Sequence, residues 1–86
     1  MTVAPVPASS LLDDALADAD REIAETERRR ERQVHLLHGL DPGTKARTCA
    51  ERLLCEIDWT LSINHTHRTL IQNLLATETS NDVGSP

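Results

Sequence analysis

The sequence predicts an all-α fold, an antiparallel two-helix hairpin that resembles a coiled coil in its apolar spacing. Residues 45–77 contain no Gly or Pro and carry most of the large apolar residues. A second apolar stripe precedes them within residues 11–38. Between the two lie Pro42 and Gly43, which favour a tight turn. Phe and Tyr are absent and strand formers never alternate with polar residues, so a sheet is not expected.

Composition limits the classes of partner. With 86 residues the chain makes one small domain, whose stability as a monomer is marginal without a further contact. The net charge of −5 disfavours nucleic acid and anionic membranes. The basic run 28–32 follows Glu25 and Glu27 by about one turn, so we interpret it as a salt-bridged helix surface. We expect no nucleic-acid partner and no membrane partner.

The sequence also indicates a cellular compartment. It has no cationic segment leading into an apolar one, and no stretch approaches about 18 apolar residues. Cys49 and Cys55 would lie about 9 Å apart along one helix, which is too far for a disulfide between them. We therefore expect a cytoplasmic protein with two free thiols, to which the sequence assigns no role.

The first half predicts a short arm and one long helix. Residues 1–8 contain two prolines and no apolar period, which indicates a flexible arm. A helical unit then spans residues 9–78, and its first helix covers about 11–38 with Ser9 or Ser10 as N-cap. Arg30 interrupts the apolar stripe, and we expect its methylenes to lie on the stripe while its guanidinium reaches water. The stripe of this helix consists of Leu12, Leu16, Ala19, Ile23, Thr26, Arg30, Gln33, Val34 and Leu37.

The second half predicts a reversal and a longer helix. The connector 39–44 is short enough to force an antiparallel return, with Asp41 or Thr44 as the cap of the next helix. This helix covers about 45–77, and the polar residues 79–86 are expected to form a disordered tail. The stripe expected to face the first helix consists of Ala46, Ala50, Leu53, Ile57, Leu61, Asn64, Arg68, Ile71 and Leu75.

The same helix carries a second apolar face, on a different side from this stripe. A single neighbouring helix covers only one stripe, so this face needs another partner. We predict an interface made either by a homodimer, forming a four-helix bundle, or by docking onto a larger protein. Trp59 is the expected anchor, because a lone large aromatic is a common hot-spot residue. The second apolar face consists of Trp59, Ile63, His67, Leu70 and Leu74, with Cys49 at its edge.

Asn64 and Arg68 stand among Leu and Ile in the stripe that faces the first helix. Polar residues at such places lower stability but fix the register of paired helices, and we predict that role for both. Counting from the connector places Leu16 near Arg68, and so the acidic start of the first helix near His65, His67 and Arg68.

Two chemical alternatives are open. His35, His38 and Cys49 could approach one another near the connector, although no CxxC or HxxxH spacing supports a metal site. Residues 65–69, HTHRT, are loosely similar to the phospho-accepting box of sensor histidine kinases, which implies a phosphotransfer role for His65. The acidic residue that usually follows that His is missing here.

No constellation typical of an enzyme is present. The chain has no Gly-rich phosphate loop and no nucleophile in a strained turn, so we expect no catalytic residues, no cofactor and no small-molecule substrate. The predicted function is a non-catalytic protein–protein interaction module, such as a small regulatory, adaptor or accessory subunit. The alternative is a metal-binding or phosphotransfer hairpin.

Overall fold

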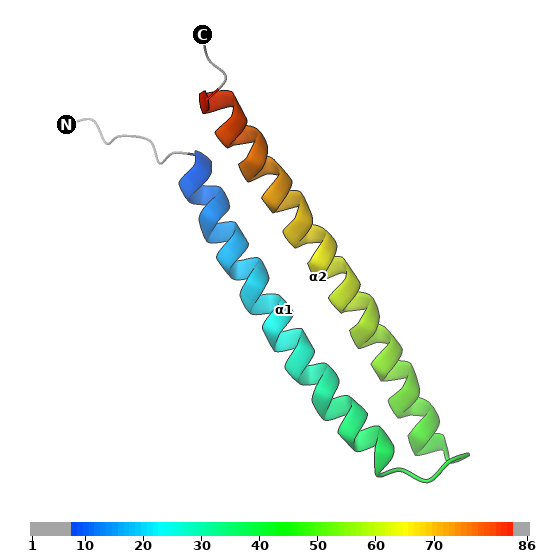
Figure 1. Ribbon diagram of the computed structural model, residues 1–86. Coiled ribbons are helices and arrows are strands. Elements are labelled where there is room, and N and C mark those ends of the chain that lie inside the picture. Colours follow the sequence, from blue (N-terminus) through cyan, green and yellow to red (C-terminus); the bar gives the residue numbers. More distant parts are fainter. Residues whose placement is uncertain (1–7, 84–86) are drawn as a thin grey trace, which may run out of the picture.

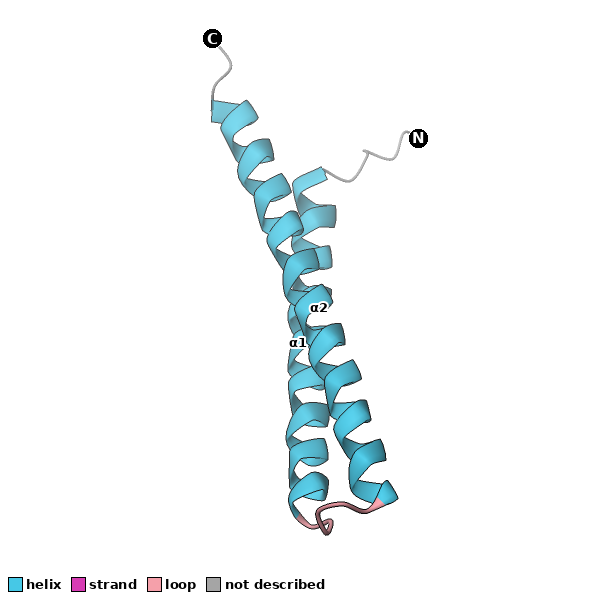
Figure 2. Ribbon diagram, turned by 90° about the vertical axis from the view of Figure 1, so that its right-hand side faces the viewer, coloured by secondary structure: helices cyan, strands magenta, loops and turns pink. Residues whose placement is uncertain are grey.

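The computed structural model describes residues 8–83, which form two long helices packed antiparallel. Helix α1 spans Ala8–His38 and helix α2 spans Lys45–Val83. They lie side by side along an elongated molecule 65 Å long and 14 Å thin (Figure 1). A view from the side shows α2 leaning across α1, with the connector closing one end (Figure 2). The predicted all-α antiparallel hairpin is confirmed.

The helix ends differ from the expected ones. Helix α1 begins at Ala8, so Ser9 and Ser10 lie within it and do not precede it. Helix α2 continues beyond Thr77 to Val83, into the segment expected to be a tail. Residues 1–7 of the expected arm and 84–86 of the expected tail lie outside the described residues. Neither described helix is long and apolar enough to cross a membrane.

The connector is built around Thr44 and Gly43. The backbone N–H of Arg47 donates to the Thr44 hydroxyl at 3.2 Å, which makes Thr44 the N-cap of α2. The same hydroxyl donates to the Asp41 carbonyl oxygen at 2.8 Å. Gly43 has a φ of 80°, the left-handed conformation that glycine adopts at least cost. Of the two caps considered, the structure therefore uses Thr44.

The two helices meet along a seam with a regular 4–3 repeat. Its buried apolar residues are Ala19, Ile23, Ala50, Ile57 and Ile71. Near the connector the repeat passes through Leu54, which is half-buried, and not through Leu53, which is 42% exposed. Ala46 is exposed as well, so the prediction was wrong for both. Only Leu54 continues the repeat, which consists in α2 of Ala50, Leu54, Ile57, Leu61, Asn64, Arg68, Ile71 and Leu75.

Polar side chains fill the middle of the seam and bond across it. The Gln33 side-chain amide donates to the Ala50 carbonyl oxygen at 3.0 Å, and Gln33 is buried. The Asn64 amide donates to the hydroxyl of the buried Thr26 at 3.0 Å. That hydroxyl in turn donates to the Glu22 carbonyl oxygen at 2.8 Å. Among the described residues, no buried side-chain N or O atom lacks a hydrogen-bond partner.

Two arginines correct the expected pairing. Arg30 does not reach only water, because its Nε donates to a carboxylate oxygen of Asp58 on the other helix at 2.5 Å. Arg68 pairs with Asp20, which lies one turn along α1 from the expected neighbour Leu16. The Asn64–Thr26 contact is shifted in the same direction, so the two helices pair about one turn away from the expected register. The prediction that the acidic part of α1 lies beside Arg68 is nevertheless confirmed.

Candidate protein-binding surface

The exposed apolar residues of α2 lie on the side that faces away from the seam. Trp59 is 69% exposed, Ile63 51%, Leu70 56% and Leu74 55%. Residues three or four apart share a helix face, so Trp59 and Ile63 form one pair and Leu70 and Leu74 another. Seam residues such as Ile57 and Ile71 are buried on the same helix. The helix therefore has one covered apolar face and one open one.

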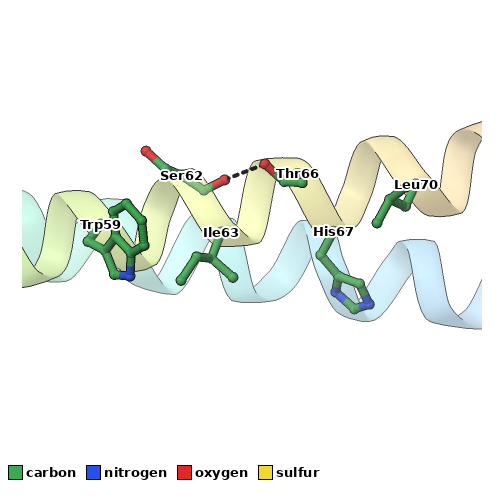
Figure 3. Close-up of a pocket in the computed structure, with 6 residues that line it drawn as sticks. All are labelled: Trp59, Ser62, Ile63, Thr66, His67 and Leu70. Atoms are coloured by element: carbon green, nitrogen blue, oxygen red, sulfur yellow. Dashed lines mark hydrogen bonds between the residues drawn. The ribbon is translucent and has the colours of Figure 1, made fainter.

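A shallow groove runs along the open face. Its volume is about 430 Å³. Trp59, Ile63 and His67 project from the same side of the α2 ribbon (Figure 3). At the other edge the Thr66 hydroxyl donates to the Ser62 carbonyl oxygen at 3.0 Å. Because a single helix forms the groove, it is a surface and not an enclosed cavity. Its lining residues are Trp59, Ser62, Ile63, Thr66, His67 and Leu70.

The structure brings together most of the predicted interface residues. Trp59, Ile63, His67 and Leu70 line the groove, and Leu74 continues the same face one turn further. Ser62 and Thr66 also line it and were not among the predicted residues. Their spacing from Trp59 and Ile63 could have indicated this, but a search for apolar residues passes over hydroxyl side chains. The role of this face in binding remains a prediction.

Three ion pairs lie together on one flank of the seam. Arg30 pairs with Asp58, Arg68 with Asp20, and Arg47 with Glu51. Each acidic partner directly follows a buried seam alanine or isoleucine, so all three occupy the same flank. We call Asp20, Glu51 and Asp58 the polar flank. Leu53 and Leu74 instead directly precede seam residues, and at about 100° per residue they fall on the opposite flank.

The polar flank was not predicted, although the sequence contains a signal for it. Antiparallel helices place equivalent flanks of the repeat beside each other, and both helices carry acidic residues there. Arginines in the stripes where the two helices meet can then pair with the acidic residues on that flank. Recognising this requires the register of both helices, and the expected register differed by one turn at Arg68.

The histidines and both thiols lie on the exposed surface of the hairpin. His35, His38, Cys49 and Cys55 are all exposed. Within the described part of the chain, no three His, Cys, Asp or Glu side chains are grouped closely enough to hold a metal ion. His65 is exposed but does not line the groove, whereas His67 does. No observation in this region favours the metal-binding or phosphotransfer alternative over a binding surface.

Comparison with protein-family models, with curated proteins and with solved structures finds no match to this chain.

Proposed function

We propose that the chain is a non-catalytic protein–protein interaction module that binds its partner through the second apolar face. The observation that carries this proposal is the exposure of four large apolar side chains on one face of α2: Trp59, Ile63, Leu70 and Leu74. Isolated exposed apolar residues are ordinary on protein surfaces, but a contiguous row of them is typical of interaction sites. The row surrounds a groove that a neighbouring side chain can enter.

The thin core of the hairpin supports the same proposal. Among the described residues, no large side chain is fully buried. Two helices alone bury one stripe each, and much of the apolar surface of α2 is still in contact with water. A partner that covers the second apolar face would remove that surface from water, which stabilises both the complex and the hairpin.

The surface also suits a protein partner better than a small molecule. Sites for small molecules surround most of the ligand, whereas this groove is open along one helix. Its chemistry is apolar at Trp59, Ile63 and Leu70, with hydroxyl and imidazole groups between them. A regulatory, adaptor or accessory subunit that presents a helical surface fits these features.

A matched pair of substitutions tests the proposal. Leu70 is 56% exposed on the second apolar face, and Leu36 is 53% exposed on α1. We expect Leu70→Glu to weaken association, with the chain itself or with a captured partner, by about 30-fold or more, while Leu36→Glu leaves it nearly unchanged. Association is measured by sedimentation and by affinity capture. If both variants associate as the native chain does, another surface binds the partner.

A further inference from the structure

The second apolar face has nearly the same spacing in both directions along α2. Trp59 and Ile63 are four residues apart at one end, and Leu70 and Leu74 are four apart at the other. Thr66 lies three residues after Ile63, and His67 lies three residues before Leu70. The midpoint of the face falls between these two polar residues. A surface with this symmetry is complementary to itself when one copy is reversed.

We propose, building on the function proposed above, that the partner is a second copy of this chain, packed antiparallel through α2. The twofold axis passes between Thr66 and His67. Trp59 then meets Leu74 of the second copy, and Ile63 meets Leu70 of the second copy. Each apolar residue finds an apolar residue, and an isologous contact of this kind needs only one patch per chain. The contact extends over about 22 Å of helix, at 1.5 Å per residue.

The polar groups at the midpoint are compatible with this contact. The Thr66 hydroxyl already donates to the Ser62 carbonyl oxygen, so its oxygen retains a lone pair for a hydrogen bond. A neutral histidine has one ring N–H to donate. In the antiparallel pair, His67 of one copy faces Thr66 of the other, and its N–H can donate to that oxygen. Each hydrogen-bond donor of Thr66 and His67 at the centre of the contact then has an acceptor.

The charges of α1 determine where the first helices lie. Asp20 pairs with Arg68, and Thr26 with Asn64, so the part of α1 level with the axis contains Glu22. Together with Glu25 and Arg29 it lines a hollow on one side of the hairpin. In a closed four-helix bundle about this axis, Glu22 would approach its own copy, which is unfavourable. The α1 helices therefore lie on the outside, and the contact is made by α2 alone.

A contact made by one helix from each copy belongs to the small class of interfaces, below about 1,200 Å² in total. Interfaces of that size are typically weak, so the dimer dissociates on dilution. The predicted homodimer is retained in this proposal, but in an open arrangement instead of a closed bundle. The two hairpins lie alongside each other with their connectors at opposite ends of the pair.

The two native cysteines allow the register to be measured without altering the contact. Cys49 and Cys55 are exposed and precede Trp59, the first of the large apolar residues of the face, by a turn or more. A spin label is attached to Cys55 in the Cys49→Ser chain, and to Cys49 in the Cys55→Ser chain. At high protein concentration, the proposed axis predicts a distance between the two labels of about 35 Å at Cys55 and about 50 Å at Cys49.

Other results would overturn the proposal. Distances below about 20 Å at both cysteines would mean a parallel pair, because equivalent residues of parallel helices stay about 10 Å apart plus the length of the labels. Two distances that still differ by about 18 Å but are not about 35 Å and about 50 Å would mean a different antiparallel register, and any other difference would mean a different contact. A monomeric mass with no coupling between labels would exclude a second copy. If the chain is monomeric, affinity capture of partner proteins by the Leu70→Glu and Leu36→Glu variants still tests the proposed function as a protein-binding module.

Discussion

Arg30 and Arg68 occupy places in the seam repeat where an apolar side chain is ordinarily found, and Arg47 lies one turn before Ala50, the first residue of that repeat in α2. Each guanidinium leaves the seam on the same flank and meets an acidic residue there. The Arg30 and Asp58 side chains are 43% and 47% exposed, so water screens their attraction. Exposed pairs of this kind contribute about 0 to 1 kcal/mol each. The two pairs that join α1 to α2, Arg30–Asp58 and Arg68–Asp20, fix which residues face each other more than they stabilise the hairpin.

Replacing Asp58 tests this estimate. We expect Asp58→Asn to lower the free energy of unfolding by less than about 1 kcal/mol at low salt, and by still less at high salt, because ions screen exposed charges. Urea unfolding followed by circular dichroism measures both values. A loss above 2 kcal/mol that persists at high salt would show that the pair is effectively shielded from water.

Thr26 and Asn64 form the polar contact in the middle of the seam. Thr26→Val removes the acceptor for the Asn64 amide, and we expect it to lower the free energy of unfolding by about 1 to 2 kcal/mol, the cost of an unpaired part-buried group. Thr69→Val is the control, because Thr69 makes the same bond to its own helix but is exposed. The double variant Thr26→Val with Asn64→Leu should recover most of the loss. A double variant as unstable as Thr26→Val alone would contradict this explanation.

At the scale of the helices, much of the structure followed from apolar spacing. The residues that form α1 and α2 were predicted because their apolar residues recur every three or four positions and the connector is short. The choice between Leu53 and Leu54 was missed, since both are leucines and only the unbroken 4–3 repeat distinguishes them. The ion pairs were missed because they depend on the register between two helices. No local pattern in one helix determines that register.

The connector offers a test at the same scale. Gly43 has a φ of 80° and nothing within 4 Å of where a side chain would begin, so a substitution there meets backbone strain alone. We expect Gly43→Ala to lower the free energy of unfolding by about 1 kcal/mol. In Gly39→Ala the new Cβ would lie 3.5 Å from the Leu36 carbonyl oxygen, an ordinary contact, so little change is expected. Thermal unfolding of both variants measures their losses of stability. Equal losses would show that the positive φ of Gly43 does not cause the loss in Gly43→Ala.

At the scale of the whole molecule, the hairpin has two unlike surfaces. The polar flank carries its ion pairs beside the seam, where both helices contribute to them. The second apolar face lies on α2 only and has no neighbour within the described hairpin. The positions of its residues on one helix face could be predicted from the sequence, because helical periodicity determines them. What covers the face could not, because that depends on a surface outside the hairpin.

Trp59 reports directly on whether the second apolar face binds a protein. It is the only tryptophan, the chain has no tyrosine, and the indole is 69% exposed in the hairpin. We expect its emission to shift to the blue as association proceeds, with rising concentration of the chain or on addition of a captured partner, because the contact removes water from the ring. Sedimentation of the same samples reports the association itself. If complexes form while the emission keeps its solvent-exposed maximum throughout, the second apolar face is not the binding surface.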